Sequence, residues 1–111
     1  MPWLVREGDV LATAEIALTR RDRRRGLRHR DHLEGALVLR PCRSVHTIGV
    51  RFPIDVAFLD RDGVVVRTCC LRPWRLSPVV AQAAAVIEAH AGAFERWRLR
   101  VGDKIEIEIE Q

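Results

Sequence analysis

The alternation of apolar and polar residues predicts β-strands along most of the chain. In residues 54–59, Ile, Val and Phe alternate with Asp, Ala and Leu, and in residues 105–110 isoleucine alternates with glutamate. A period of two places successive side chains on opposite faces of a strand. Asp60-Arg61-Asp62-Gly63 separates two apolar runs, and an Asp-Gly pair there favours a tight hairpin. We therefore predict antiparallel pairing of residues 54–60 with 64–70.

A helix with a strongly basic face is predicted after the second strand. Thr19 is followed three residues later by Asp22, which fits a capping box, so the helix should run from Arg20 to about Gly26 or Arg28. Seven arginines and only two aspartates lie between residues 20 and 32. The predicted basic face comprises Arg20, Arg21, Arg24, Arg25 and Arg28.

That basic face has two main interpretations, and a small anionic ligand at the N-terminus of the helix is a third possibility. Arginine clusters contribute phosphate contacts in nucleic-acid binding, and they also serve as protein interaction surfaces. Alternatively, the face is simply solvated, with arginine stems covering the edge of the sheet. We favour the second interpretation, because no nucleic-acid recognition motif accompanies the arginines and aromatic residues make up only 5% of the chain.

Length and composition favour one cytoplasmic domain that spans residues 1–111. With 48% hydrophobic residues, the chain can bury a single core. Because no apolar run reaches the 18 or so residues of a membrane span, we expect no membrane partner. The N-terminus lacks the basic start and apolar stretch of a signal peptide. The three cysteines form neither a Cys-x-x-Cys pair nor a Cys/His ligand spacing, so we expect no metal and no cofactor.

A polar group precedes and enters the strand at residues 54–59. Asp55 lies in mid-strand, on the face of Ala57 and Leu59, and a buried carboxylate must be paired, hydrogen-bonded or protonated. The nearest polar residues in sequence are His46, Thr47 and Arg51. Two interpretations stay open: Asp55 tethers the turn at residues 49–53, or these four residues together form a binding pocket.

Several motifs together resemble the bacterial and archaeal family known as domain of unknown function 192. They are Arg25-Gly26-Leu27, Leu33-Glu34-Gly35-Ala36-Leu37, Pro53-Ile54-Asp55-Val56-Ala57-Phe58-Leu59-Asp60 with Gly63, Gly92, and Val101-Gly102-Asp103. The resemblance covers about residues 10–109. It departs at residues 46–52, where many family members have Phe-Trp-Met-Lys-Asn-Thr. A ligand bound by that segment would therefore differ here.

The resemblance implies a mostly β fold without an assigned activity. It also implies a strand near residues 84–89 and a second short helix from about Gly92, in a region whose alanines alone would favour helix. The fold expected is therefore mainly β, a small antiparallel β-sandwich or barrel-like domain with two short peripheral helices.

For function, we prefer a non-catalytic domain that binds a small anionic or hydroxylated ligand through His46, Thr47, Arg51 and Asp55. Arg51 would face the anion and Asp55 would hold Arg51 in place. An uncharacterised hydrolase or lyase is the first alternative, with His46 as general base oriented by Asp55. Its only evident nucleophile is Cys42, which lies some 13 Å from His46 if the segment is extended. A nucleic-acid or protein interaction module using residues 20–30 is the second alternative.

Overall fold

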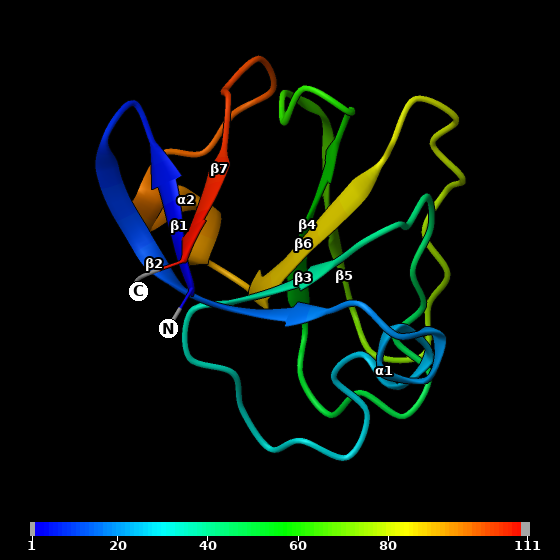
Figure 1. Ribbon diagram of the computed structural model, residues 1–111. Helices are drawn as coiled ribbons and strands as arrows, with labels where there is room; N and C mark the ends of the chain where they lie inside the picture. The colour runs from blue at the N-terminus through cyan, green and yellow to red at the C-terminus, as the bar shows by residue number, and fades with distance from the viewer. Residues whose placement is uncertain (1, 110–111) are drawn as a thin grey trace.

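The computed structural model describes residues 2–109, which form seven β-strands and two short helices (Figure 1). The strands are β1 (Pro2–Arg6), β2 (Asp9–Ala17), β3 (Ala36–Leu39), β4 (Ile54–Leu59), β5 (Val65–Leu71), β6 (Ala85–His90) and β7 (Glu106–Ile109). The helices are α1 (Arg20–Arg25) and α2 (Ala93–Trp97). The predicted mainly β fold with two short helices is confirmed. No helix in this described part of the chain is long and apolar enough to cross a membrane.

All seven strands belong to one sheet, in the order β5-β4-β6-β3-β2-β1-β7. The predicted hairpin is present as the antiparallel pair of β4 and β5. The pair of β2 and β3 is parallel, with Ala14 opposite Ala36, so the sheet is mixed rather than purely antiparallel as expected. Parallel neighbours need a crossover of a dozen or more residues. Residues 18–35, which include α1, provide that crossover.

The two edges of the sheet meet, which makes the domain barrel-like. Val64, just before β5, forms a bridge with Lys104, which precedes β7. The amide of Ile105 donates to the carbonyl of Gly63 at 2.8 Å. Gly63 has a φ of +85°, and a Cβ at this position would lie 2.6 Å from the Ile105 carbonyl oxygen. Glycine therefore serves both the hairpin turn and the close approach that joins the edges.

Apolar side chains pack on both faces of the central strands β3, β4 and β6. Inside the barrel, Val38 and Ile87 are completely buried. On the outer face, Phe58 is equally buried and packs in a second cluster with the segments 27–33 and 50–52. Strands covered on both faces read as near-continuous apolar runs. A charged residue within such a run is therefore placed in the core.

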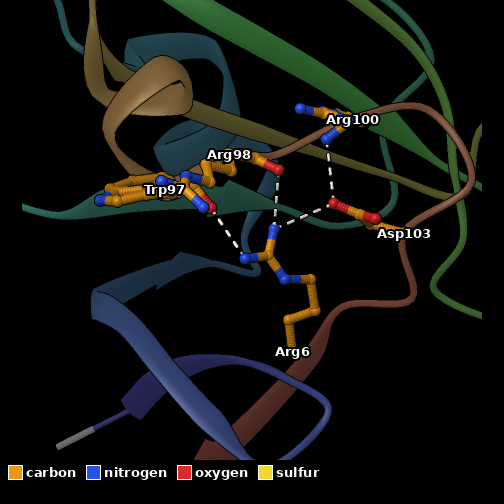
Figure 2. Close-up of polar contacts among 5 residues, drawn as sticks. All are labelled: Arg6, Trp97, Arg98, Arg100 and Asp103. Atoms are coloured by element: carbon orange, nitrogen blue, oxygen red, sulfur yellow. Dashed lines mark hydrogen bonds and ion pairs between the residues drawn. The ribbon is translucent and has the colours of Figure 1, made fainter.

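One arginine ties the end of α2 to β1 and to the turn before β7 (Figure 2). The guanidinium of Arg6 donates to the carbonyls of Trp97 at 2.8 Å and Arg98 at 3.0 Å. It also forms an ion pair with Asp103 at 3.0 Å, and Asp103 accepts a hydrogen bond from the amide of Arg100 at 2.9 Å. The aspartate of the Gly-Asp motif thus has a structural role, because it orients the turn that leads into β7.

Candidate functional site

Asp55, the mid-strand carboxylate, caps α2. Its Oδ2 accepts hydrogen bonds from the amides of Gly92 at 2.9 Å and Phe94 at 3.1 Å. Amides at a helix start lack partners within the helix, and an aspartate is among the preferred residues to accept from them. Asp55 is therefore a structural tether, but the element that it holds is α2 rather than the turn at residues 49–53.

Thr47 is also occupied by structural contacts. It is completely buried, and its hydroxyl donates to the carbonyl of Arg72 at 2.6 Å. The same oxygen accepts from the amide of Arg75 at 2.8 Å. The hydroxyl thereby joins the segment around residue 47 to the loop that follows β5.

Arg51 forms a surface ion pair with Asp31 at 2.6 Å, and the two side chains are 57% and 82% exposed. Within residues 2–109, no hydrogen bond joins two of the four residues from which a pocket was expected, namely His46, Thr47, Arg51 and Asp55. The reason is the alternation of β4. Asp55 points to the face that carries α2, whereas the segment before β4 packs on the outer face.

We expect Asp55→Ala to lower the free energy of unfolding by about 1–2 kcal/mol, because two amides of α2 lose their acceptor. Arg51→Ala is the control, since an ion pair this exposed contributes less than about 1 kcal/mol. Urea denaturation of both variants beside the wild type measures the difference. Equal losses in the two variants would contradict the capping role of Asp55.

His46, the remaining member of the expected pocket, lines a cavity of about 230 Å³ between α1 and the segment 41–46. The cavity lies over the outer face of the sheet and is bordered on one side by α1. Its polar lining consists of Arg20, Arg23, Arg24 and Arg25 from α1, Cys42, Ser44 and His46 from the opposite wall, and Glu88 from β6.

Glu88 is the buried acid of this cavity. Its side chain is on the outer face of β6, the residue is 2% exposed, and Oε1 has no hydrogen-bond partner among the described residues. Burial raises the pKa of Glu88 to about 8, and the positive charge of Arg30 offsets only part of this effect. Arg30 itself donates two hydrogen bonds to Glu15, at 2.8 Å and 3.2 Å. At neutral pH Glu88 is therefore mainly a neutral carboxylic acid, able to donate one hydrogen bond and accept others.

Gly26, which ends α1, lies beside this acid. Its φ is +49°, and a Cβ there would lie 3.6 Å from Oε1 of Glu88. This distance is an ordinary van der Waals contact, so the left-handed turn at the end of α1, rather than a lack of space beside Glu88, is the reason for glycine here.

The arginines of α1 differ in what they contact. Arg23 donates to the carbonyls of Leu18 and Arg40, which fastens α1 to the ends of β2 and β3. Arg20, Arg24 and Arg25 are exposed, and their side chains make no hydrogen bond or ion pair with the part of the chain that is described. Unpaired cations at the mouth of a cavity whose buried acid is neutral create a positive potential there.

Cys42 and His46 are set up as hydrogen-bonding groups rather than as a reacting pair. Burial raises the pKa of the Cys42 thiol, which donates to the carbonyl of Ser44 at 3.1 Å. Nδ1 of His46 accepts from the amide of Ile48 at 3.2 Å, so the proton of the neutral ring is on Nε2. A protonated thiol is a poor nucleophile. Asp55, the proposed orienting partner of His46, lies on the inner face of β4, whereas the cavity lined by His46 lies over the outer face of the sheet.

The predicted basic face is divided between two hollows. Arg20 lines only the cavity with Glu88, whereas Arg21 and Arg28 line a second, shallower one of about 380 Å³. Arg24 and Arg25 border both. The stem of Arg28 packs against Gly49, so this side chain is half-buried and partly structural.

Glu88 was missed in the interpretation of the sequence. It interrupts the run Ala84-Ala85-Val86-Ile87 and is followed by Ala89, the pattern of a strand buried on both faces. Once a strand is assigned to this segment, a single glutamate within it is the signal of a buried acid. The family resemblance implies a strand here, whereas the alanines alone favour a helix, and a glutamate on the solvated face of a helix carries no such signal.

A model of the DUF192 family, described as an uncharacterized ACR, matches residues 4–107 of this chain. Two curated relatives are UPF0127 proteins of Pyrococcus abyssi and Pyrococcus furiosus, which are 38% and 36% identical over 63 residues. In both comparisons the match covers 57% of this chain and 54% of the relative, so the chain spans about half the length of the curated relatives that it matches.

Two crystal structures share the fold. A protein of unknown function from Novosphingobium aromaticivorans DSM 12444 superposes with a TM-score of 0.79 at 21% identity, covering 95% of this chain and 82% of that one. A protein from Sinorhizobium meliloti 1021, described as a transcription regulator by provisional assignment, superposes with a TM-score of 0.78 at 20% identity. The match covers 95% of this chain and 90% of that one. Likeness at this level of identity establishes the fold alone.

Proposed function

The chain belongs to the DUF192 family, and we propose that it binds a small anionic ligand in the cavity between α1 and β6. The observation that carries this proposal is Oε1 of Glu88, a buried polar atom that has no hydrogen-bond partner in residues 2–109, on a residue that lines the cavity. Buried polar atoms in native proteins nearly always have a hydrogen-bond partner. A ligand that fills the cavity would provide one for Glu88.

Charge and size narrow the ligand class. Arg20, Arg24 and Arg25 have no acidic partner in residues 2–109, so a carboxylate or phosphate group would be bound by them. The neutral acid of Glu88 would donate to, or accept from, a hydroxyl or carbonyl at the opposite end of the ligand. A volume of about 230 Å³ is below that of a site for a drug-sized molecule, which favours a compact metabolite.

Binding without catalysis is the better-supported function. A hydrolase that used His46 and Asp55 would need these side chains on one face, but Asp55 caps α2 on the other. Cys42, the nucleophile that the sequence suggested, is held as a thiol by burial. Binding of an anion between the arginines and a neutral acid requires neither a His46–Asp55 pair nor a reactive thiol.

Ligand-observed NMR with a library of small carboxylates and phosphate esters tests the proposal. Arg20 and Arg21 are adjacent on α1, but only Arg20 lines the cavity with Glu88, so their alanine variants carry the same charge change. We expect at least one compound to bind the wild type and to bind Arg20→Ala at least tenfold more weakly, the loss typical of one charged hydrogen bond. Arg21→Ala should bind within about threefold of the wild type.

Glu88→Gln provides a second readout, because it keeps the shape of the side chain but replaces the acid with an amide. A ligand that contacts Glu88 should change affinity in this variant. Equal weakening by Arg20→Ala and Arg21→Ala, with no effect of Glu88→Gln, would show that the compounds respond only to the general positive charge of α1. That result would overturn the assignment of the cavity.

A further inference from the structure

Four large apolar side chains are exposed on two neighbouring segments. Trp74 is 66% exposed, and Leu76 and Val79 are each 74% exposed in the loop between β5 and β6. Ile48, on the adjoining segment before β4, is 40% exposed. Single exposed apolar residues are ordinary, but a group of them within one short loop marks an interaction surface. We call these four residues, together with Arg72 and Arg75, the Trp74 surface.

The backbone beneath the Trp74 surface is firmly held. The amide of Trp74 donates to the carbonyl of Thr47 at 2.9 Å, and the amide of Thr47 donates to the carbonyl of Arg75 at 2.8 Å. The amide of Ser77 donates to the carbonyl of Val45 at 2.9 Å. The two segments therefore run side by side along one edge of the molecule (Figure 1). The buried hydroxyl of Thr47 adds two further hydrogen bonds to this arrangement.

Trp74 itself has an unusual backbone conformation, with a φ of +63°. A bulky residue in the left-handed region is strained by roughly 1–2 kcal/mol. Strained positions persist where the surrounding contacts over-determine them, and they cluster at binding sites. Here the contacts to Thr47 hold an indole in solvent rather than in the core, so the loop presents a pre-arranged apolar anchor.

The two segments that carry the Trp74 surface contain arginines but no acidic residue, although Asp31 from another segment pairs with Arg51. Neither residues 35–54 nor residues 63–87 contain an aspartate or glutamate. Arg72 and Arg75 flank Trp74 and are exposed, and the guanidinium of Arg75 donates a hydrogen bond to the carbonyl of Trp74 at 3.3 Å and to no other group in the described part of the chain. An apolar loop that is flanked by arginines and has no acidic residue in its own segment fits an anionic partner that also offers an apolar interior.

We propose that the Trp74 surface binds the face of an anionic lipid membrane. The indole and the aliphatic side chains would enter the headgroup region, where tryptophan is favoured, while Arg72 and Arg75 contact lipid phosphates. This is peripheral contact by a loop, so the absence of a membrane span from the sequence does not bear on it. A single nucleic-acid strand would stack on Trp74 and pair with the arginines, but it leaves the exposure of Leu76 and Val79 unexplained.

Co-sedimentation with vesicles tests the proposal. We expect the protein to bind vesicles in which about a third of the lipid is phosphatidylglycerol, and to bind pure phosphatidylcholine vesicles at least tenfold more weakly. The double variant Arg72→Ser/Arg75→Ser should bind the anionic vesicles about 25-fold more weakly, at roughly fivefold for each arginine. Arg61→Ser/Arg100→Ser, which removes two exposed arginines elsewhere, should bind like the wild type.

A second matched pair tests the apolar contribution. Leu76→Ser should bind the anionic vesicles several-fold more weakly, whereas Leu18→Ser, at a leucine that is 60% exposed elsewhere, should not. Equal effects within either pair, or no binding to anionic vesicles, would overturn the proposal. A short single-stranded oligonucleotide, tested in parallel, distinguishes the nucleic-acid alternative. If the protein bound the oligonucleotide but not the vesicles, and Trp74→Ala lost that binding, a nucleic acid rather than a membrane would be the partner.

Discussion

Replacing Glu88 with glutamine is expected to remove most of the pH dependence of stability between about pH 4.5 and pH 8. The pKa of Glu88 is raised by burial from 4.5 to about 8 in the folded chain, so in this range the folded state binds a proton that the unfolded state has released. The stabilisation from the protonated acid is complete below about pH 4.5. It is lost as pH rises through the folded pKa, since the buried acid must then ionise.

Urea denaturation at about pH 5, 7 and 8.5 measures this effect. The wild type should lose several kcal/mol of unfolding free energy relative to Glu88→Gln over this range, since one pKa unit corresponds to about 1.4 kcal/mol. Subtracting the variant from the wild type also cancels the titration of the histidines. Glu34→Gln, at an exposed glutamate, is the control and should follow the wild-type curve. Parallel curves for the wild type and Glu88→Gln would mean that Glu88 is ionised in the folded state.

Gly35→Ala should be the most destabilising single methyl addition among the described glycines. A Cβ at Gly35 would lie 2.3 Å from the carbonyl oxygen of Thr13 and 2.5 Å from its Oγ1, at a φ of +71°. This contact lies where β2 and β3 meet as parallel neighbours, with Ala14 opposite Ala36. The methyl group would have to separate the two strands, and we expect a loss of about 3–4 kcal/mol from the clash and the backbone strain together.

Gly8→Ala separates these two contributions. Gly8 has a similar φ of +82°, but nothing lies within 4 Å of the position of its Cβ. The control should therefore lose only the roughly 1–2 kcal/mol of the left-handed conformation. Thermal and urea denaturation of the two variants give the difference directly. A similar loss in both would show that the backbone of β2 and β3 relaxes without cost, and that close approach at Gly35 does not matter.

Local features were predictable because neighbours in sequence determine them. The alternation in residues 54–59, the Asp-Gly turn and the cap at Thr19 act over a few residues, and the structure has a strand, a hairpin and a helix at these places. The assignment of residues 85–90 as a strand came instead from the family resemblance, because the local preference of alanine for helix is weak.

The candidate site was only partly predictable. His46 and the arginines of α1 were identified as residues with binding chemistry, and the structure places His46, Arg20, Arg24 and Arg25 around one cavity. Arg51 and Asp55, expected in the same pocket, bind Asp31 and the start of α2 instead. β4 begins between Arg51 and Asp55, and the alternation of its side chains directs Asp55 to the face opposite the one on which the preceding segment packs.

By itself, the sequence determined the secondary structure of its strongly patterned segments and the chemical character of α1, because period, turn residues and caps are local. Only the tertiary structure decided which strands pair, that β2 and β3 run parallel, and that the sheet edges meet at Gly63. It also decided that Glu88 lies buried opposite Gly26, 62 positions earlier in the chain. These features depend on pairings between residues that are distant in sequence. The free energy that stabilises such pairings comes from burial and from backbone hydrogen bonds that no short segment can form alone.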